Sequence, residues 1–203
     1  MIDINSVNEQ IQIGRHELGS SPKAILSLRR RTRIWAAMND PDDIEISFKH
    51  RVKLKLMCIH HVKHIWHSIL QEEAELDEMI SLVYNLVSGN TPKEEGETAG
   101  EKFLQKITDR YGNEKSNFPA IMIADAVSDT VVSACYMDPD LDIVDTTDDD
   151  DGMLPDMLEA SYTCASAAAG ALNWQPVEET DVAARRAFWL WYLDEAISAV
   201  LAG

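Results

Sequence analysis

The stretch Ile46–Leu70, "ISFKHRVKLKLMCIHHVKHIWHSIL", decides the fold class of this chain. Its apolar residues recur at steps of three and four, which is the spacing of one face of an α-helix. Elsewhere, no stretch alternates apolar and polar residues for long enough to predict a convincing strand. We therefore predict a long helix in an all-α protein, with a buried face made by Phe48, Val52, Leu56, Ile59, Val62, Trp66 and Ile69.

The same periodicity predicts six further helices on either side of this one. Several of their ends carry helix signals, such as a glycine stop at Gly89 and a capping Thr180 or Asp181 before the last helix. Apart from one acidic loop before the last two helices, the connections are about ten residues or fewer, so residues 1–203 are expected to form a single-domain bundle of about seven helices. The six further ranges are 20–38, 74–89, 97–112, 118–137, 154–174 and 180–201.

The charge of the chain restricts its partners. Thirty-five acidic residues against eighteen basic ones give a net charge of −17, and only residues 1–70 have more Lys and Arg than Asp and Glu. Such a surface repels nucleic acids and anionic membranes and attracts basic proteins. The apolar run "AFWLWYL" is also far short of the roughly 20 residues that span a bilayer. We therefore predict no nucleic-acid partner and no membrane partner.

The three cysteines and the N-terminus indicate a cytoplasmic protein. Cys58, Cys135 and Cys164 lie far apart, each in an apolar stretch, which predicts buried thiols in a reducing compartment. The N-terminal "MIDINSVNEQIQIG" mixes acidic and amide side chains with its apolar ones, unlike a signal peptide.

The most unusual stretch is the acidic loop 138–152, "DPDLDIVDTTDDDDG", which contains no lysine or arginine. It could hold a hard cation, serve as a solvated linker, or attract a basic partner. A calcium loop needs a glycine at position six and a glutamate at position twelve. With Gly152 at position six, Thr147 stands first and Leu158 stands twelfth, so the ligand set is incomplete. The acids of the loop are Asp138, Asp140, Asp142, Asp145, Asp148, Asp149, Asp150 and Asp151.

A histidine group in the long helix is a second candidate for metal binding. His60, His64 and His67 fall within about 60° of one another on the helix, whereas His61 points away. Two imidazoles at i and i+4 can share a metal ion, but no HExxH or CxxC motif completes a ligand set. A polar helix flank is the favoured interpretation, and we predict no metal and no cofactor.

An enzymatic alternative comes from the acidic stretch "EEAELDEM". All-α hydrolases of nucleotides hold magnesium between acidic pairs on facing helices, and Glu72, Glu75 and Glu78 have the spacing of one helix face. The second pair is missing, because Asp125 and Asp129 share a face without a matching glutamate. A solvated helix start explains the acids equally well, since they favour the helix dipole. No catalytic residue is therefore assigned.

The last helix carries aromatic residues on two sides. Trp189 lies on one side and Trp191 on the other, so the helix is central or leaves one face for a partner. We predict that Trp189 is a core residue and that Trp191 is a candidate partner-binding residue. Arg185 and Arg186 are expected to be structural arginines of this helix.

Four motifs in a fixed order give the chain a family resemblance. "LRRRTRIWAAM", "KLKLMCIHHVKHIW", "LVYNLVSG" and "ARRAFWLWYLDEAISA" resemble the all-α immunity proteins numbered five among those that guard bacterial polymorphic toxin systems. The resemblance covers most of the chain. It falls on Arg29, Arg30, Arg31, Trp35, Ile65, Trp66, the alanines of 165–171, Arg185, Arg186, Phe188, Trp189, Trp191, Leu193, Glu195, Ala196 and Ala199.

The resemblance implies a cytoplasmic antidote that binds a cognate toxin and blocks it without chemistry. A nuclease-like toxin needs a basic active face, which an inhibitor of charge −17 would approach quickly. The acidic loop is then interpreted as the surface that attracts this partner. A metal-dependent nucleotide hydrolase and a helical scaffold or oligomerisation module, including a homodimer, are the alternatives.

Overall fold

The computed structural model describes residues 1–70, 74–143 and 158–202 of the chain. Its described residues form helices and no strand, which confirms the all-α fold class. The α-helices are α1 (Ile4–Ser20), α2 (Leu28–Met38), α3 (Ile44–Ile69), α4 (Glu75–Val87), α5 (Lys93–Tyr111), α6 (Phe118–Cys135), α7 (Ala160–Ala169), α8 (Val182–Trp191) and α9 (Ile197–Leu201). A π-helical segment, Tyr192–Ala196, joins α8 to α9, and short 3-10 turns occur at Lys115–Asn117 and Val177–Glu179.

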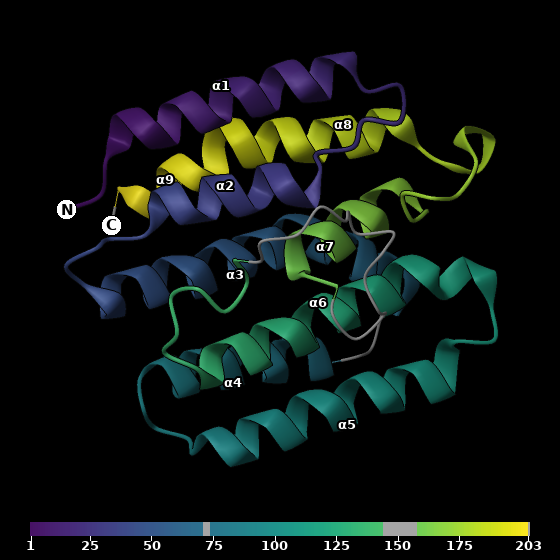
Figure 1. Cartoon of the computed structure of the whole chain (residues 1–203). Coiled ribbons are helices and arrows are strands. Elements are labelled where there is room, and N and C mark those ends of the chain that lie inside the picture. The colour runs from purple at the N-terminus through teal and green to yellow at the C-terminus, as the bar shows by residue number, and fades with distance from the viewer. Residues whose placement is uncertain (71–73, 144–157, 203) are drawn as a thin grey trace.

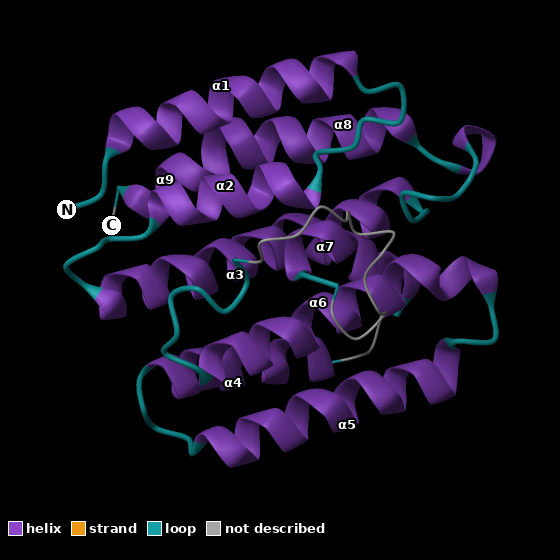
Figure 2. Ribbon diagram, in the orientation of Figure 1, coloured by secondary structure: helices purple, strands orange, loops and turns teal. Residues whose placement is uncertain are grey.

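The helices stack in layers around α3 (Figures 1 and 2). Helices α1, α2, α8 and α9 lie on one side of α3 and α7, and α4, α5 and α6 lie on the other. Both ends of the chain lie at the same end of the bundle, close to the beginning of α3. One continuous hydrophobic core connects these layers.

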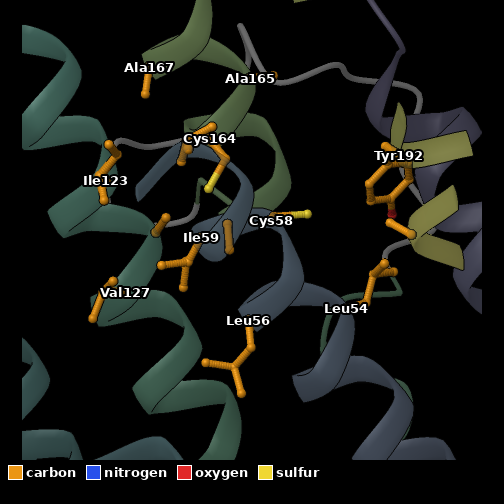
Figure 3. Packing of buried hydrophobic residues seen from close by; sticks show 14 of the residues in the cluster. Leu54, Leu56, Cys58, Ile59, Ile123, Val127, Cys164, Ala165, Ala167 and Tyr192 are labelled. Carbon is orange, nitrogen blue, oxygen red and sulfur yellow. The ribbon is translucent and has the colours of Figure 1, made fainter. Parts of the chain in front are cut away.

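Helix α3 is buried on more than one face, and Figure 3 shows why. Leu56 and Ile59 point toward Ile123 and Val127 of α6, while Leu54 points toward Tyr192 at the end of the chain. A helix with neighbours on two sides needs an apolar surface wider than a single stripe. This position explains the long apolar pattern from which the sequence predicted the helix.

Helix α6 occupies the centre of the lower layer, against α3, α4, α5 and α7. The stretch Lys115–Cys135 is long and apolar enough to cross a membrane by length and composition, and 56% of that window is buried inside the protein. This window is longer than the apolar run "AFWLWYL" of the last helix. Burial against four neighbours accounts for the apolar character of α6.

Close approach of α5 to its neighbours depends on small residues. A Cβ atom at Gly96 would lie 2.8 Å from both Leu86 and Cys135, and one at Gly100 would lie 3.3 Å from Val131. These glycines are therefore positions where α5 approaches α4 and α6 too closely for a side chain.

The predicted helix positions agree with the structure except at three places. Helix α1 was missed, although Asp3 caps it and its buried residues follow helical spacing. The helix predicted over 20–38 begins only after the cap Ser27, because Ala24 adopts a positive φ of 54° that interrupts any earlier helix. The helix predicted over 154–174 is limited, among described residues, to α7 and ends at Gly170, which has a left-handed φ of 63°.

Candidate functional site

A buried cluster of charged side chains lies beneath the beginning of the acidic loop. We call it the buried charge cluster: Arg31, Arg51, Lys55, Asp129, Asp142 and Glu159. At its centre, the Lys55 ammonium lies 2.7 Å from an Asp129 oxygen and 3.0 Å from an Asp142 oxygen. The Lys55 side chain is only 3% exposed. Such a cation is tolerated in a protein interior only when carboxylates compensate it.

The cluster shifts the pKa values of its members. Burial lowers the pKa of Lys55, but Asp129 and Asp142 outweigh burial and leave it above its ordinary value. Burial raises the pKa of Asp129 to about 6, and the negative charges of Asp142 and Glu159 act in the same direction against the effect of Lys55. Lys55 is therefore a permanent cation, whereas Asp129 is the member that can change its charge near neutral pH.

The cluster joins segments that are far apart in sequence. Asp129 accepts a hydrogen bond from the Ala160 amide at 2.9 Å, at the first turn of α7. Glu159 caps the same helix through the Ser161 amide and lies 3.7 Å from Arg31. Asp142 of the acidic loop and the first turn of α7 are therefore both held by the buried charge cluster.

The described part of the acidic loop divides into outward and inward residues. Asp138 and Asp140 are exposed, and the Asp140 amide donates to the Asp138 side chain at 2.9 Å. Asp142 differs from the prediction of an exposed partner-binding residue, because its carboxylate is turned inward to Lys55 and is 15% exposed. Its side chain is already paired within the chain. The predicted partner-binding residues Asp145, Asp148, Asp149, Asp150 and Asp151 lie outside the described residues.

A small cavity lies between the acidic loop and α3. Its volume is about 20 Å³, and Trp35, Arg51, Asp142 and Ile143 contribute to its lining. This volume admits about one water molecule, whereas pockets for organic ligands are about 300 Å³ or larger. This cavity is therefore too small to hold an organic substrate.

Trp189 and Trp191 of α8 lie in different environments. Trp189 is 2% exposed and packs edge to face against Phe188 and Tyr192, which confirms it as a core residue. Trp191 is half-buried, and its ring stacks on His61 of α3 with the ring centroids 3.7 Å apart. The side of α8 that was expected to be free for a partner is thus covered in part by α3. The role of Trp191 in partner binding stays a prediction.

The arginines of α8 are structural, as predicted. Arg185 is 1% exposed, and its guanidinium donates to the Ala171 carbonyl at 2.5 Å. Arg186 donates to the Ser21 carbonyl at 2.8 Å and so ties α8 to the end of α1. The guanidinium beside the indole of Trp189 belongs instead to Arg31, 5.5 Å from the ring centroid.

The histidine group lies on the solvent-facing side of α3. His60, His64 and His67 are all exposed. Across residues 1–70, 74–143 and 158–202, no three His, Cys, Asp or Glu side chains come together in a group that could hold a metal ion.

The acids proposed for the hydrolase alternative face bases in the described structure. Glu75 and Glu78 of α4 line an open groove against α5, and the side chains opposite them are Lys102 and Lys106. The Lys106 ammonium lies 2.5 Å from Glu75. Glu72 lies outside the described residues. A magnesium site needs further oxygen ligands at this position, and α5 presents ammonium groups there.

Two of the three cysteines are buried, as predicted. Cys58 and Cys164 are fully buried, and burial raises the pKa of both thiols well above the ordinary value. Cys135 was predicted to be buried as well, but its side chain is only half-buried. It sits at the last turn of α6, where its thiol donates to the Lys93 carbonyl at 3.3 Å.

Residues 11–199 match the family model described as immunity protein Imm5. Because the match covers nearly the whole chain, the protein belongs to the Imm5 family of immunity proteins. A comparison with curated proteins finds no match. Family membership indicates a toxin-neutralising role that is not enzymatic.

Proposed function

We propose that this protein neutralises a basic, nuclease-like toxin in the cytoplasm by binding it through the acidic loop 138–152. The observation that carries the proposal is the exposure of Asp138 and Asp140 at the described beginning of this loop, in a chain of net charge −17. Asp142 is left out of the binding surface, because it is paired with Lys55.

Electrostatic attraction between an acidic inhibitor and a basic toxin acts mainly on the rate of association. A toxin that cleaves nucleic acid must neutralise phosphates, so its active face carries Lys and Arg. A strongly acidic inhibitor is steered toward such a face, and long-range attraction raises the association rate until salt screens it. Carboxylates on the toxin's phosphate-binding face would also exclude the substrate. Inhibition then needs no reaction, in keeping with the family's role.

The test replaces Asp148, Asp149, Asp150 and Asp151 by asparagine and measures binding kinetics. A basic nuclease toxin domain encoded next to the gene for this protein, once it is identified there by sequencing, serves as the probe. Association should slow by roughly tenfold or more at low salt, and the difference from the parent should shrink above about 0.15 M salt. The melting temperature should stay unchanged or rise slightly, because four consecutive carboxylates repel one another and their removal relieves that repulsion.

A control comes from two exposed acids of the 3-10 turn Val177–Glu179. Replacing Glu178 and Glu179 by glutamine removes charge outside the acidic loop and should slow association much less. Equal association rates for parent and quadruple variant at every salt concentration would contradict the proposal and leave the loop as a linker.

A further inference from the structure

Two Asp-Pro-Asp turns, about a hundred residues apart in sequence, lie side by side at one end of the bundle. The first, Asp40–Asp42, connects α2 to α3, and the second, Asp138–Asp140, follows α6. The Asn39 amide group joins them by donating to the Pro139 carbonyl at 3.3 Å and to Asp140 at 3.1 Å. The first turn lies far from the acidic loop in sequence, so no local pattern links the two. The fold makes both turns one surface.

Large apolar side chains are exposed next to these acids in the chain. Ile44 is 56% exposed, Met137 is 59% exposed and Leu141 is 37% exposed. Ile44 lies two helical turns before Arg51 on the same side of α3, and Arg51 donates to the Tyr136 carbonyl. The Ile44 side of α3 is therefore the side that faces the second turn. We call Asp42, Ile44, Met137, Asp138, Asp140 and Leu141 the corner surface.

The composition of the corner surface is that of an interface. Single exposed apolar residues are ordinary on protein surfaces, and so are single carboxylates. Apolar anchors surrounded by charged groups are instead typical of the centre and rim of a binding site. The carboxylates around the anchors are exposed, with the Asp42 side chain 84% accessible. Asp42 pairs with the N-terminal ammonium at 2.8 Å, so Asp138 and Asp140 are the carboxylates that this surface offers to cations of a partner.

The corner surface is also held in place from behind. Before the second turn, Arg51 donates to the Ser133 carbonyl of α6 at 2.9 Å, and after it Lys55 holds Asp142 at 3.0 Å. Within the first turn, the Asp42 amide donates to the Asp40 side chain at 2.9 Å. A surface that is ordered before binding loses less conformational entropy when a partner arrives.

We propose that the corner surface is the docking site of the toxin, with Ile44 and Met137 as its apolar anchors. The occupant is a protein surface with an apolar spot surrounded by Arg and Lys, because guanidinium and ammonium groups complement Asp138 and Asp140. This inference rests on the proposed function for the nature of the partner. It adds the α2–α3 turn to the site and assigns the binding energy to apolar contacts, with the acids mainly setting the association rate.

The test compares Ile44→Ser, Met137→Ser and the double variant with the parent. Binding to the neighbouring toxin domain is measured by surface plasmon resonance, and the melting temperature of each variant checks folding. The double variant should bind at least about tenfold more weakly, mainly through faster dissociation, as truncated interface anchors do. Its melting temperature should change little, because both side chains are largely exposed.

A control variant separates local from general effects. Trp174 is 52% exposed on the connection between α7 and α8, at the far end of the bundle from the corner surface (Figure 1). Trp174→Ser removes more apolar area and should leave the dissociation constant within about twofold of the parent's.

Three results would overturn the inference, and they are distinguishable. If the double variant binds like the parent while the Asp148–Asp151 variant associates slowly, the toxin uses the acidic loop without the corner surface. If the double variant only breaks a dimer seen by size-exclusion chromatography, the corner surface binds a second copy of this chain. If the parent does not bind the toxin domain at all, the proposed function fails together with this inference.

Discussion

Replacing Lys55 by methionine removes the cation at the centre of the buried charge cluster while keeping a side chain of similar length. Asp129 and Asp142 then lose an ammonium at 2.7 and 3.0 Å. At an effective dielectric constant of about 20, each of these pairs is worth roughly 6 kcal/mol of Coulomb energy. Much of that is offset, because the ammonium no longer has to be desolvated. The expected loss in the free energy of unfolding is about 3–5 kcal/mol at pH 7.5, the range for a broken buried ion pair.

The pH dependence of this loss identifies its cause. Burial raises the pKa of Asp129 to about 6, so in the parent this residue favours folding most at acid pH, and its contribution falls as pH rises from about 4 to about 6. Without Lys55, the pKa of Asp129 must rise further, because the group that lowers it is gone. The deficit of the variant should therefore be small at pH 5 and should grow toward pH 7.5.

Urea unfolding at both pH values, followed by tryptophan fluorescence, measures the deficit. Lys49→Met on the same helix is the matched control: Lys49 and Glu45 form a surface pair with side chains 52% and 60% exposed. That change should cost less than about 1 kcal/mol at either pH. A loss for Lys55→Met below about 1 kcal/mol, or one that does not depend on pH, would refute the view that this lysine compensates buried carboxylates.

Two further predictions concern packing, and both are measured by urea or thermal unfolding. Trp189→Ala should cost about 3–5 kcal/mol because the ring is buried, whereas Trp191→Ala should cost about 1 kcal/mol because its stacked ring is half in solvent. Equal costs would show that the two rings contribute alike to the core. Gly96→Ala should cost about 1–3 kcal/mol because its Cβ would lie 2.8 Å from Leu86, while Gly19→Ala, whose Cβ meets nothing within 4 Å, should be neutral or stabilising. A neutral Gly96→Ala would mean that α4 and α5 separate without loss.

The helices were largely predictable because their signals are local. The apolar spacing of α3 and the cap Asp181 of α8 are patterns within a few residues, and both are found as expected. Helix α1 also had local signals, in Asp3 and in the helical spacing of Val7, Ile11 and Leu18, but its polar composition hid them. Amphipathic helices at the edge of a bundle carry fewer apolar residues, so they are the easiest to miss.

The site was less predictable because it depends on residues that are distant in sequence. Asp142 looked like one more exposed aspartate, and its partner Lys55 stands 87 residues earlier in the chain. Asp129 was set aside because it shares a helix face with Asp125 without a matching glutamate, although Asp142 and Glu159 both lie near it in the fold. Side-chain spacing within one helix says nothing about such pairs, since they arise only when helices pack.

The buried charge cluster also bears on how the acidic loop can serve as a binding element. Asp142, two residues after the second turn, pairs with Lys55, and the Ala160 amide at the start of α7 donates to Asp129, which itself pairs with Lys55. A chain that leaves and returns at one fixed point closes a loop, and lengthening such a loop costs little, about 0.6 kcal/mol per doubling. Changes between these two anchors therefore need not disturb the bundle. The charge and length of the chain between Asp142 and Ala160 can therefore change to suit a partner. Lys55 meanwhile holds Asp142, next to the corner surface, in place.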